Sequence, residues 1–185
     1  MGYCVGMEPA PLHRLLRACT ASAHARLDAG LAGGFRDAGD YDGYLAGMAR
    51  FLDRAIAVIG AEAWLLEARV ALASDLGQPE PAPASGPVEV DSARLAGWRY
   101  VVAGATMGAR VLLRRAGALD GGAHLPRTRF LSTFSSSDAW PRSLAVLRDA
   151  GFDPPARARA CDAALEAFAV AEAAFHPARG PAHAA

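Results

Sequence analysis

Apolar residues recur at helical spacing along almost the whole chain, and this pattern restricts the fold more than any other feature. No stretch alternates strictly between apolar and polar residues as a half-buried strand does, and no internal repeat is evident. We therefore predict an all-α fold, a multi-helical bundle in a single domain, built by packing helix on helix. The first apolar stripe consists of Leu12, Leu15, Leu16, Cys19, Ala23 and Leu27.

Capping residues and helix breakers divide the pattern into segments. Pro11 suits the first turn of the first helix, and Asp40 can cap a second helix that Gly60 ends. Asp91 or Ser92 can cap a later one. The helices are expected over about residues 12–27, 40–59, 61–76, 92–116, 140–150 and 155–175.

The segments between these helices carry loop signals. Residues 78–87 contain four prolines, which exclude a regular helix and indicate a surface loop. Gly121 and Gly122 mark a turn, and residues 130–138 are expected to form another loop.

Length and charge limit the kind of protein. The chain has 185 residues, which suits one domain over residues 1–185, with a core over about residues 10–176. Residues 1–9 and 177–185 are expected to be flexible. The 19 basic residues balance the 19 acidic ones. This balance argues against a protein that binds nucleic acid or an anionic membrane.

Cysteine content and hydropathy favour a cytoplasmic protein. Cys4, Cys19 and Cys161 are odd in number and lack the spacing of a zinc site or a disulfide framework. Arg99 and Arg110 interrupt the apolar segment that precedes Leu113, and the first residues lack the pattern of a signal peptide. We therefore expect neither a signal peptide nor a membrane span.

The first segment with chemical character contains Arg17 and His24. Seven residues separate them, so that in a helix both project from one face, about 10 Å apart along the axis, with Thr20 between them. A neutral imidazole is a good iron ligand, and an arginine at that distance can reach a carboxylate on the same ligand. Taken alone, however, a histidine on a helix is more often a surface or hydrogen-bonded core residue.

The second segment carries three glycines on one helical face. Gly97, Gly104 and Gly108 are spaced by seven and four residues. Glycine inside a helix costs roughly 1 kcal/mol relative to alanine, so a stripe of three indicates a close approach. The approaching group is either a neighbouring helix or a flat ligand lying against the backbone.

Both segments resemble bacterial biliverdin-forming haem oxygenases. The string Leu-Arg-x-x-Thr-x-x-x-His-x-x-Leu-Asp over residues 16–28 resembles their proximal helix, and Gly-x-x-Tyr-Val-x-x-Gly-x-x-x-Gly-Ala over residues 97–109 is similar to their distal helix. The resemblance implies that His24 ligates the haem iron and that Arg17 contacts a propionate. It also implies that the oxygen-side catalytic positions are Gly104, Ala105 and Gly108, and that the haem-binding residues are Arg17, Thr20, His24, Tyr100, Gly104 and Gly108.

The activity implied is oxidation of haem, as substrate and cofactor, with O2 to biliverdin, CO and iron. A ferredoxin or reductase is implied as electron donor, since no Gly-x-Gly-x-x-Gly follows a strand pattern, and a bilin-binding photoreceptor is a possible acceptor of the product. Ala105 stands where the family usually has Ser or Asp, and Ala103 where bacterial members often have Glu. A carrier that binds haem without efficient cleavage is therefore the main alternative; a thiaminase-like hydrolase is another, but no cysteine nucleophile with acidic partners is evident.

Three further residues have an ordinary structural interpretation. Met107 is interpreted as a packing residue rather than a second iron ligand. Residues 130–134 and Trp140 are similar to a family segment whose aromatic residues cover one haem edge, although Phe134 and Trp140 equally fit a hydrophobic core.

Overall fold

The computed structural model describes residues 11–31, 34–35, 37–81, 91–116 and 127–175, and every regular element in these ranges is a helix. The predicted all-α bundle is therefore confirmed. The helices are α1 (Leu12–Leu31), α2 (Ala38–Ile59), α3 (Ala63–Leu76), α4 (Ser92–Ala116), α5 (Arg129–Ser136), α6 (Ala139–Asp149) and α7 (Pro154–Phe175).

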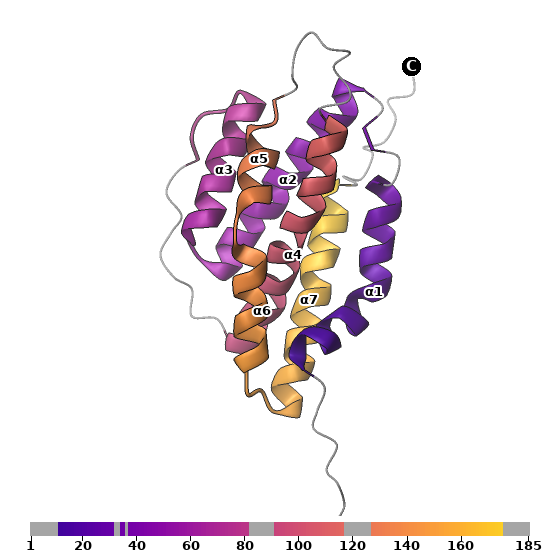
Figure 1. Ribbon diagram of the computed structural model, residues 1–185, viewed down its shortest axis with the longest axis vertical. Helices are drawn as coiled ribbons and strands as arrows, with labels where there is room; N and C mark the ends of the chain where they lie inside the picture. The colour runs from indigo at the N-terminus through magenta and orange to yellow at the C-terminus, as the bar shows by residue number, and fades with distance from the viewer. Residues whose placement is uncertain (1–10, 32–33, 36, 82–90, 117–126, 176–185) are drawn as a thin grey trace, which may run out of the picture.

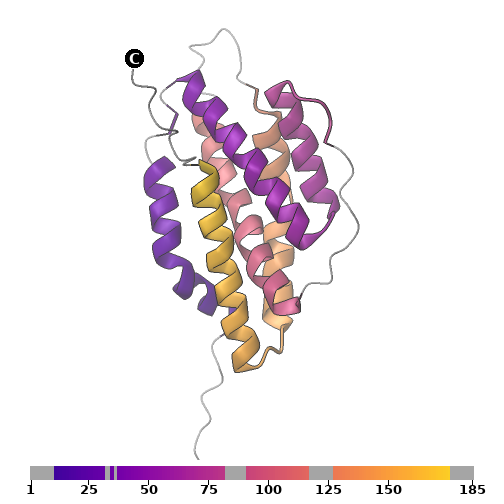
Figure 2. The same cartoon turned by 180° about the vertical axis from the view of Figure 1, so that it is seen from behind.

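Two long helices, α4 and α7, form the centre of the bundle and pack along one another (Figure 1). Helix α1 lies along α7 on one side, and α2 covers both central helices as the view from behind shows (Figure 2). Helix α3 packs against α2 and α5, while α5 and α6 follow one another along α4. No helix in the described ranges is long and apolar enough to cross a membrane.

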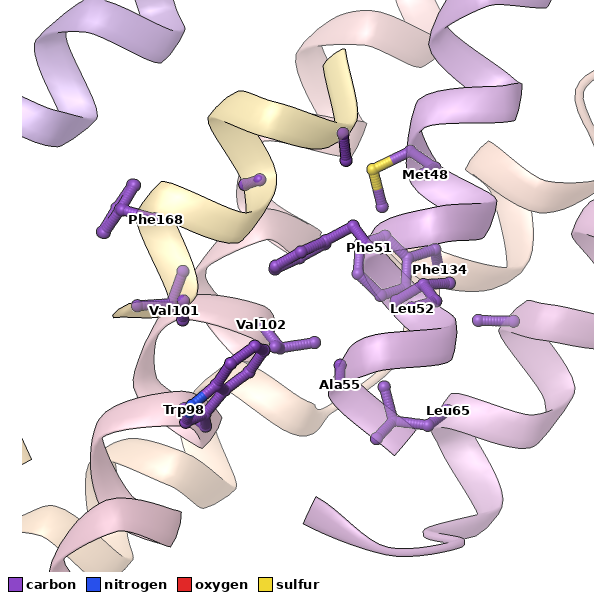
Figure 3. Packing of buried hydrophobic residues seen from close by; sticks show 14 of the residues in the cluster. Met48, Phe51, Leu52, Ala55, Leu65, Trp98, Val101, Val102, Phe134 and Phe168 are labelled. Atoms are coloured by element: carbon purple, nitrogen blue, oxygen red, sulfur yellow. The ribbon is translucent and has the colours of Figure 1, made fainter. Parts of the chain in front are cut away.

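The hydrophobic core joins α2, α4 and α7 and extends to α3 and α5. Phe51 of α2 stacks on Trp98 of α4 with ring centroids 6.4 Å apart, and Trp98 is fully buried. Burial of such large side chains is the main stabilising contribution to a helical bundle. Figure 3 labels part of this core: Met48, Phe51, Leu52, Ala55, Leu65, Trp98, Val101, Val102, Phe134 and Phe168.

The helix ends follow the local signals with one correction. The cap of α2 is Asp37 and not Asp40, because the backbone N–H of Asp40 donates to the Asp37 carboxylate over 2.8 Å. Asp40 therefore occupies the third helical position, whose free N–H needs an acceptor three residues earlier. Gly60 and Gly77 end α2 and α3 as expected, with φ of 95° and 64°.

Several expectations lie outside the described residues. They are the turn at Gly121 and Gly122, most of the proline-rich loop, and the flexible ends at residues 1–9 and 177–185. The expected cap of α4 does lie among the described residues, because the Ala93 and Arg94 amides hydrogen-bond to Asp91. The side chain of Arg159 also donates to Asp91, and this hydrogen bond is the main cause that lowers the Asp91 pKa.

The expected loop over residues 130–138 is wrong, because most of this segment forms helix α5. Phe130, Leu131 and Phe134 share one face of that helix and are almost completely buried. The backbone N–H of Phe130 donates to the carboxylate of Asp75 over 2.8 Å, and Asp75 itself is only 4% exposed. A side chain of α3 thus satisfies one of the free amides at the start of α5.

We expect Asp75→Ala to lower the free energy of unfolding by about 2–3 kcal/mol, because it leaves a buried N–H without an acceptor. Asp153→Ala is the matched control, since Asp153 accepts the Ala156 N–H over 2.8 Å at an exposed position before α7. Its cost should be about 1 kcal/mol or less. Urea unfolding followed by circular dichroism measures both, and equal losses would contradict this role of Asp75.

Candidate functional site

His24 stands on the outer surface of α1 with its ring orientation set by a neighbour one turn later. Its Nδ1 lies 2.9 Å from Oδ2 of Asp28, and 63% of the histidine side chain is exposed. A carboxylate on Nδ1 keeps the proton on that nitrogen and directs Nε2, with its lone pair, away from the pair. This arrangement suits an imidazole that ligates a metal through Nε2.

Phe168 of α7 supports one edge of the His24 ring. The two ring centroids are 5.8 Å apart and the planes are inclined at 70°. The residue before the histidine, Ala23, is buried, so His24 lies at the margin of the face that α1 turns toward the bundle. The imidazole is therefore in contact with Phe168 on the side that faces the bundle and exposed on its other side.

Arg17, Thr20 and Tyr100 come together where α1 meets α4. Burial raises the pKa of Tyr100, while a hydrogen bond with the Thr20 side chain and the positive charge of Arg17 oppose the rise. Thr20 is 2% exposed and donates to the Leu16 carbonyl over 2.7 Å, whereas Arg17 is exposed. Arg17 and Tyr100 thus have polar groups that a ligand could reach, whereas Thr20 is buried beneath them and interacts with Tyr100.

Beyond Tyr100, α4 presents a partly exposed apolar face, formed by Gly104, Met107, Gly108 and Val111 and called here the open face. Met107 is 41% and Val111 40% exposed, and a methyl group added at Gly108 would meet no atom within 4 Å. The interpretation of Met107 as a packing residue is therefore wrong in this structure. Apolar side chains exposed together along a helix indicate a surface that a partner or ligand covers.

Trp140 of α6 borders the open face at the end nearest Tyr100. The ring centroids of Trp140 and Tyr100 are 5.6 Å apart, and a methyl group at Gly104 would lie 3.5 Å from the indole. Phe134, in contrast, is a core residue that stacks on Phe130 and Trp64. Of the two aromatic residues that the sequence left open, only Trp140 lies beside the candidate site.

Gly97 has a different neighbour from Gly104 and Gly108, although the three share one helical face. A methyl group there would overlap the carbonyl oxygen of Ala160 and lie 2.8 Å from the amide nitrogen of Ala164. Gly97 therefore permits the close approach of α4 to α7. The three glycines do not serve one ligand, because their neighbours change along α4.

The polar side chains near Ala105 are directed elsewhere. Thr106 is fully buried, and its hydroxyl donates to the Ala103 carbonyl over 2.7 Å. Arg110 donates through Nε to the Ser135 carbonyl over 2.9 Å, which ties its side chain to α5. Position 105 itself carries only a methyl group, so its own side chain extends no polar group over the open face.

Sequence reasoning assigned no role to Asp28 or Phe168 at this site, and it left Trp140 open between a position at the haem edge and one in the core. Asp28 could have been found, because a carboxylate four residues after a histidine faces it on a helix. Trp140 and Phe168 come from α6 and α7, and no local pattern relates them to His24 or Gly104.

Comparison with known proteins adds one finding. No protein-family model and no curated protein sequence matches the chain. The structure is similar to that of the heme oxygenase from Neisseria meningitidis, solved with NO and CO bound, with a TM-score of 0.60, 22% sequence identity, and coverage of 91% of this chain and 92% of that one. The chain therefore shares the all-helical fold of a haem oxygenase.

Proposed function

We propose that the protein binds haem between α1 and α4 and oxidises it, with O2 and externally supplied electrons, to biliverdin, CO and iron. The observation that carries this proposal is the position of His24 relative to the open face. Both helices run in the same direction from the place where Thr20 meets Tyr100 (Figure 1). His24 and Gly104 each follow that point by four residues, about 6 Å along the axis, and so stand at the same level.

The residues present fit a haem. His24, oriented by Asp28, would supply the imidazole nitrogen that holds the iron. The open face is apolar and lacks side-chain bulk at Gly104 and Gly108, as the flat face of a porphyrin requires. Arg17 and Tyr100 lie at one end of this space, where the guanidinium can pair with a propionate and the phenol can donate to one.

Each residue has a defined task in the proposed reaction. When bound, haem supplies the iron at which O2 is activated and the porphyrin carbon that is oxidised. His24 would hold the iron, Asp28 would orient the imidazole, and Arg17 would pair with a propionate. The backbone of Gly104 and Gly108 limits the space on the opposite side. Electrons come from a ferredoxin or a reductase, and a bilin-binding photoreceptor is a suitable acceptor of the product.

A haem carrier is the second candidate, and the surroundings of Ala105 favour it. Proton delivery to bound oxygen needs an ordered water or a polar group. Ala105 offers neither a donor nor an acceptor on its side chain, and the Thr106 hydroxyl is bonded to the Ala103 carbonyl in the core. A protein with these side chains can bind haem through His24 and still cleave it slowly.

The reaction distinguishes the two candidates. With stoichiometric ferric haem, O2 and a ferredoxin system or ascorbate, we expect the Soret band to disappear while biliverdin and CO form together. Catalase should not suppress this conversion, because free peroxide is not the oxidant. A haem complex that survives reduction in air, or that bleaches without releasing CO, would instead establish the carrier.

A further inference from the structure

Helices α1 and α7 run side by side in the same direction, which brings two cysteines into register. His24 contacts Phe168, and further on, two residues along α1 and four along α7, Arg26 donates to Glu172 over 2.8 Å. Cys19 and Cys161 each precede the His24–Phe168 contact by between one and two turns. The order of contacts along both helices therefore places the cysteines opposite one another.

The two thiols lie near one another, since the neighbouring Cys161 thiol contributes to the raised pKa of Cys19, and both cysteines are free and half-buried. Cys19 Sγ also lies 3.3 Å from the Leu16 carbonyl oxygen. Helices α1 and α7 pack against one another, and both cysteines adjoin the hydrophobic core. A disulfide needs Cα atoms within about 4–7 Å, and residues that face one another across such a helix contact can meet this requirement.

We propose that Cys19 and Cys161 form a reversible disulfide when the protein meets hydrogen peroxide, and that this bond fastens α1 to α7. The proposal requires no ligand and is independent of the proposed activity. Its consequence concerns α1, the helix that carries His24, because a covalent bond less than two turns below the imidazole limits how far that helix can move away from α7.

The two cysteines have different tasks in this reaction. Burial raises the pKa of the Cys19 thiol to about 12, and the neighbouring Cys161 thiol adds to the rise, so Cys19 stays protonated at neutral pH. When Cys161 loses its proton, its sulfur attacks one peroxide oxygen, the O–O bond breaks, and a sulfenic acid and hydroxide result; the hydroxide takes up the released proton and leaves as water. Cys19 attacks that sulfur as its proton leaves, the S–O bond breaks, and a second water departs. Peroxide gains the two electrons that the thiols lose, and a dithiol reductant reverses the step.

Peptide mapping tests the proposal on the ligand-free protein. Arginines separate the three cysteines of the chain into three tryptic peptides, so the partners in any linkage are distinguishable. After treatment with a small excess of hydrogen peroxide and alkylation, we expect a peptide that joins Cys19 to Cys161, in protein that remains monomeric on a non-reducing gel. The melting temperature should rise by about 5 °C or more, since the bond closes a long loop. Dithiothreitol should reverse both changes.

The controls separate this bond from other oxidation. Cys4→Ser should keep the linked peptide and the rise in melting temperature, and Cys161→Ser should lose both. A linkage through Cys4, or separate sulfinic acids at Cys19 and Cys161, would overturn the proposal. The mapping of the wild-type protein remains decisive even where Cys161→Ser alters folding, because it identifies the linked residues directly.

Discussion

Replacing Gly97 with alanine should lower the free energy of unfolding by about 3 kcal/mol, the upper part of the range for overpacked cores. The new methyl group would overlap the Ala160 carbonyl oxygen and lie 2.9 Å from Cβ of Ala163. The first of these is a backbone atom of α7, which no side-chain rotation can move. The two central helices must therefore separate, and this cost exceeds the roughly 1 kcal/mol that alanine gains over glycine in a helix.

Gly108→Ala is the matched control on the same helix. A methyl group there meets no atom within 4 Å, so only the helix preference remains and the ligand-free protein should gain about 0.5–1 kcal/mol. Guanidinium unfolding measures the free energy of unfolding of both variants. In thermal unfolding, the melting temperature of the Gly97 variant should be about 6–12 °C below that of the wild type. Equal stabilities for the two variants would contradict the close contact of α4 with α7.

Haem titration should rank the same two variants in the opposite order from their stabilities. If the open face receives haem as proposed, the methyl group of Gly108→Ala occupies the space that the porphyrin needs, and affinity should fall although stability rises. Gly97 of α4 faces α7 and lies away from this space, so the folded fraction of the Gly97 variant should retain its affinity. The two glycines thus separate packing from ligand binding, which their shared spacing alone does not do.

The helices that sequence predicts well carry their own start and stop signals. Gly60 and Gly77 adopt positive φ where α2 and α3 end, and this conformation is a property of glycine itself. Long stripes at helical spacing, as in α1 and α7, likewise need no information from elsewhere. Such signals are sufficient for the all-α architecture and for most helix boundaries.

Helix α5 was not predicted because its stability comes from residues that are distant in the sequence. It has eight residues, too few to be stable alone, and three of them are serines, which are typical of loops. Asp75 of α3 binds its first turn, and Trp64 stacks on Phe134 with ring centroids 6.1 Å apart. Both partners precede the helix by more than fifty residues in the chain, and nothing in the local pattern identifies them.

The candidate site divides in the same way. A helical repeat correctly puts Arg17, Thr20 and His24 along one side of α1, but it does not show that Thr20 is buried while His24 is exposed. The spacing of Gly97 and Gly108 is equally regular, yet only the packing of α7 against the first half of α4 gives them different neighbours. Periodicity determines which residues share a face, whereas tertiary packing determines what covers it.

His24→Ala should abolish the spectrum of histidine-ligated ferric haem, because the variant removes the nitrogen proposed to bind the iron. The folded protein should otherwise be unchanged, since 63% of this side chain is exposed and its hydrogen bond is to Asp28 on the same helix. Substitutions of exposed residues usually alter stability by about 0.5 kcal/mol or less. Added imidazole should restore the spectrum by occupying the vacated position.

Two further variants on α1 make this experiment specific. Asp28→Ala leaves the ligand in place but frees its Nδ1, so haem affinity should fall by roughly 10-fold to 100-fold while the histidine spectrum persists. His13→Ala removes a half-buried histidine near the start of the same helix and should leave haem binding unchanged. An unaltered spectrum in His24→Ala, or its loss in His13→Ala, would refute the assignment of His24. Because the three variants alter one helix at different levels, their contrast tests the position of the iron as well as the identity of its ligand.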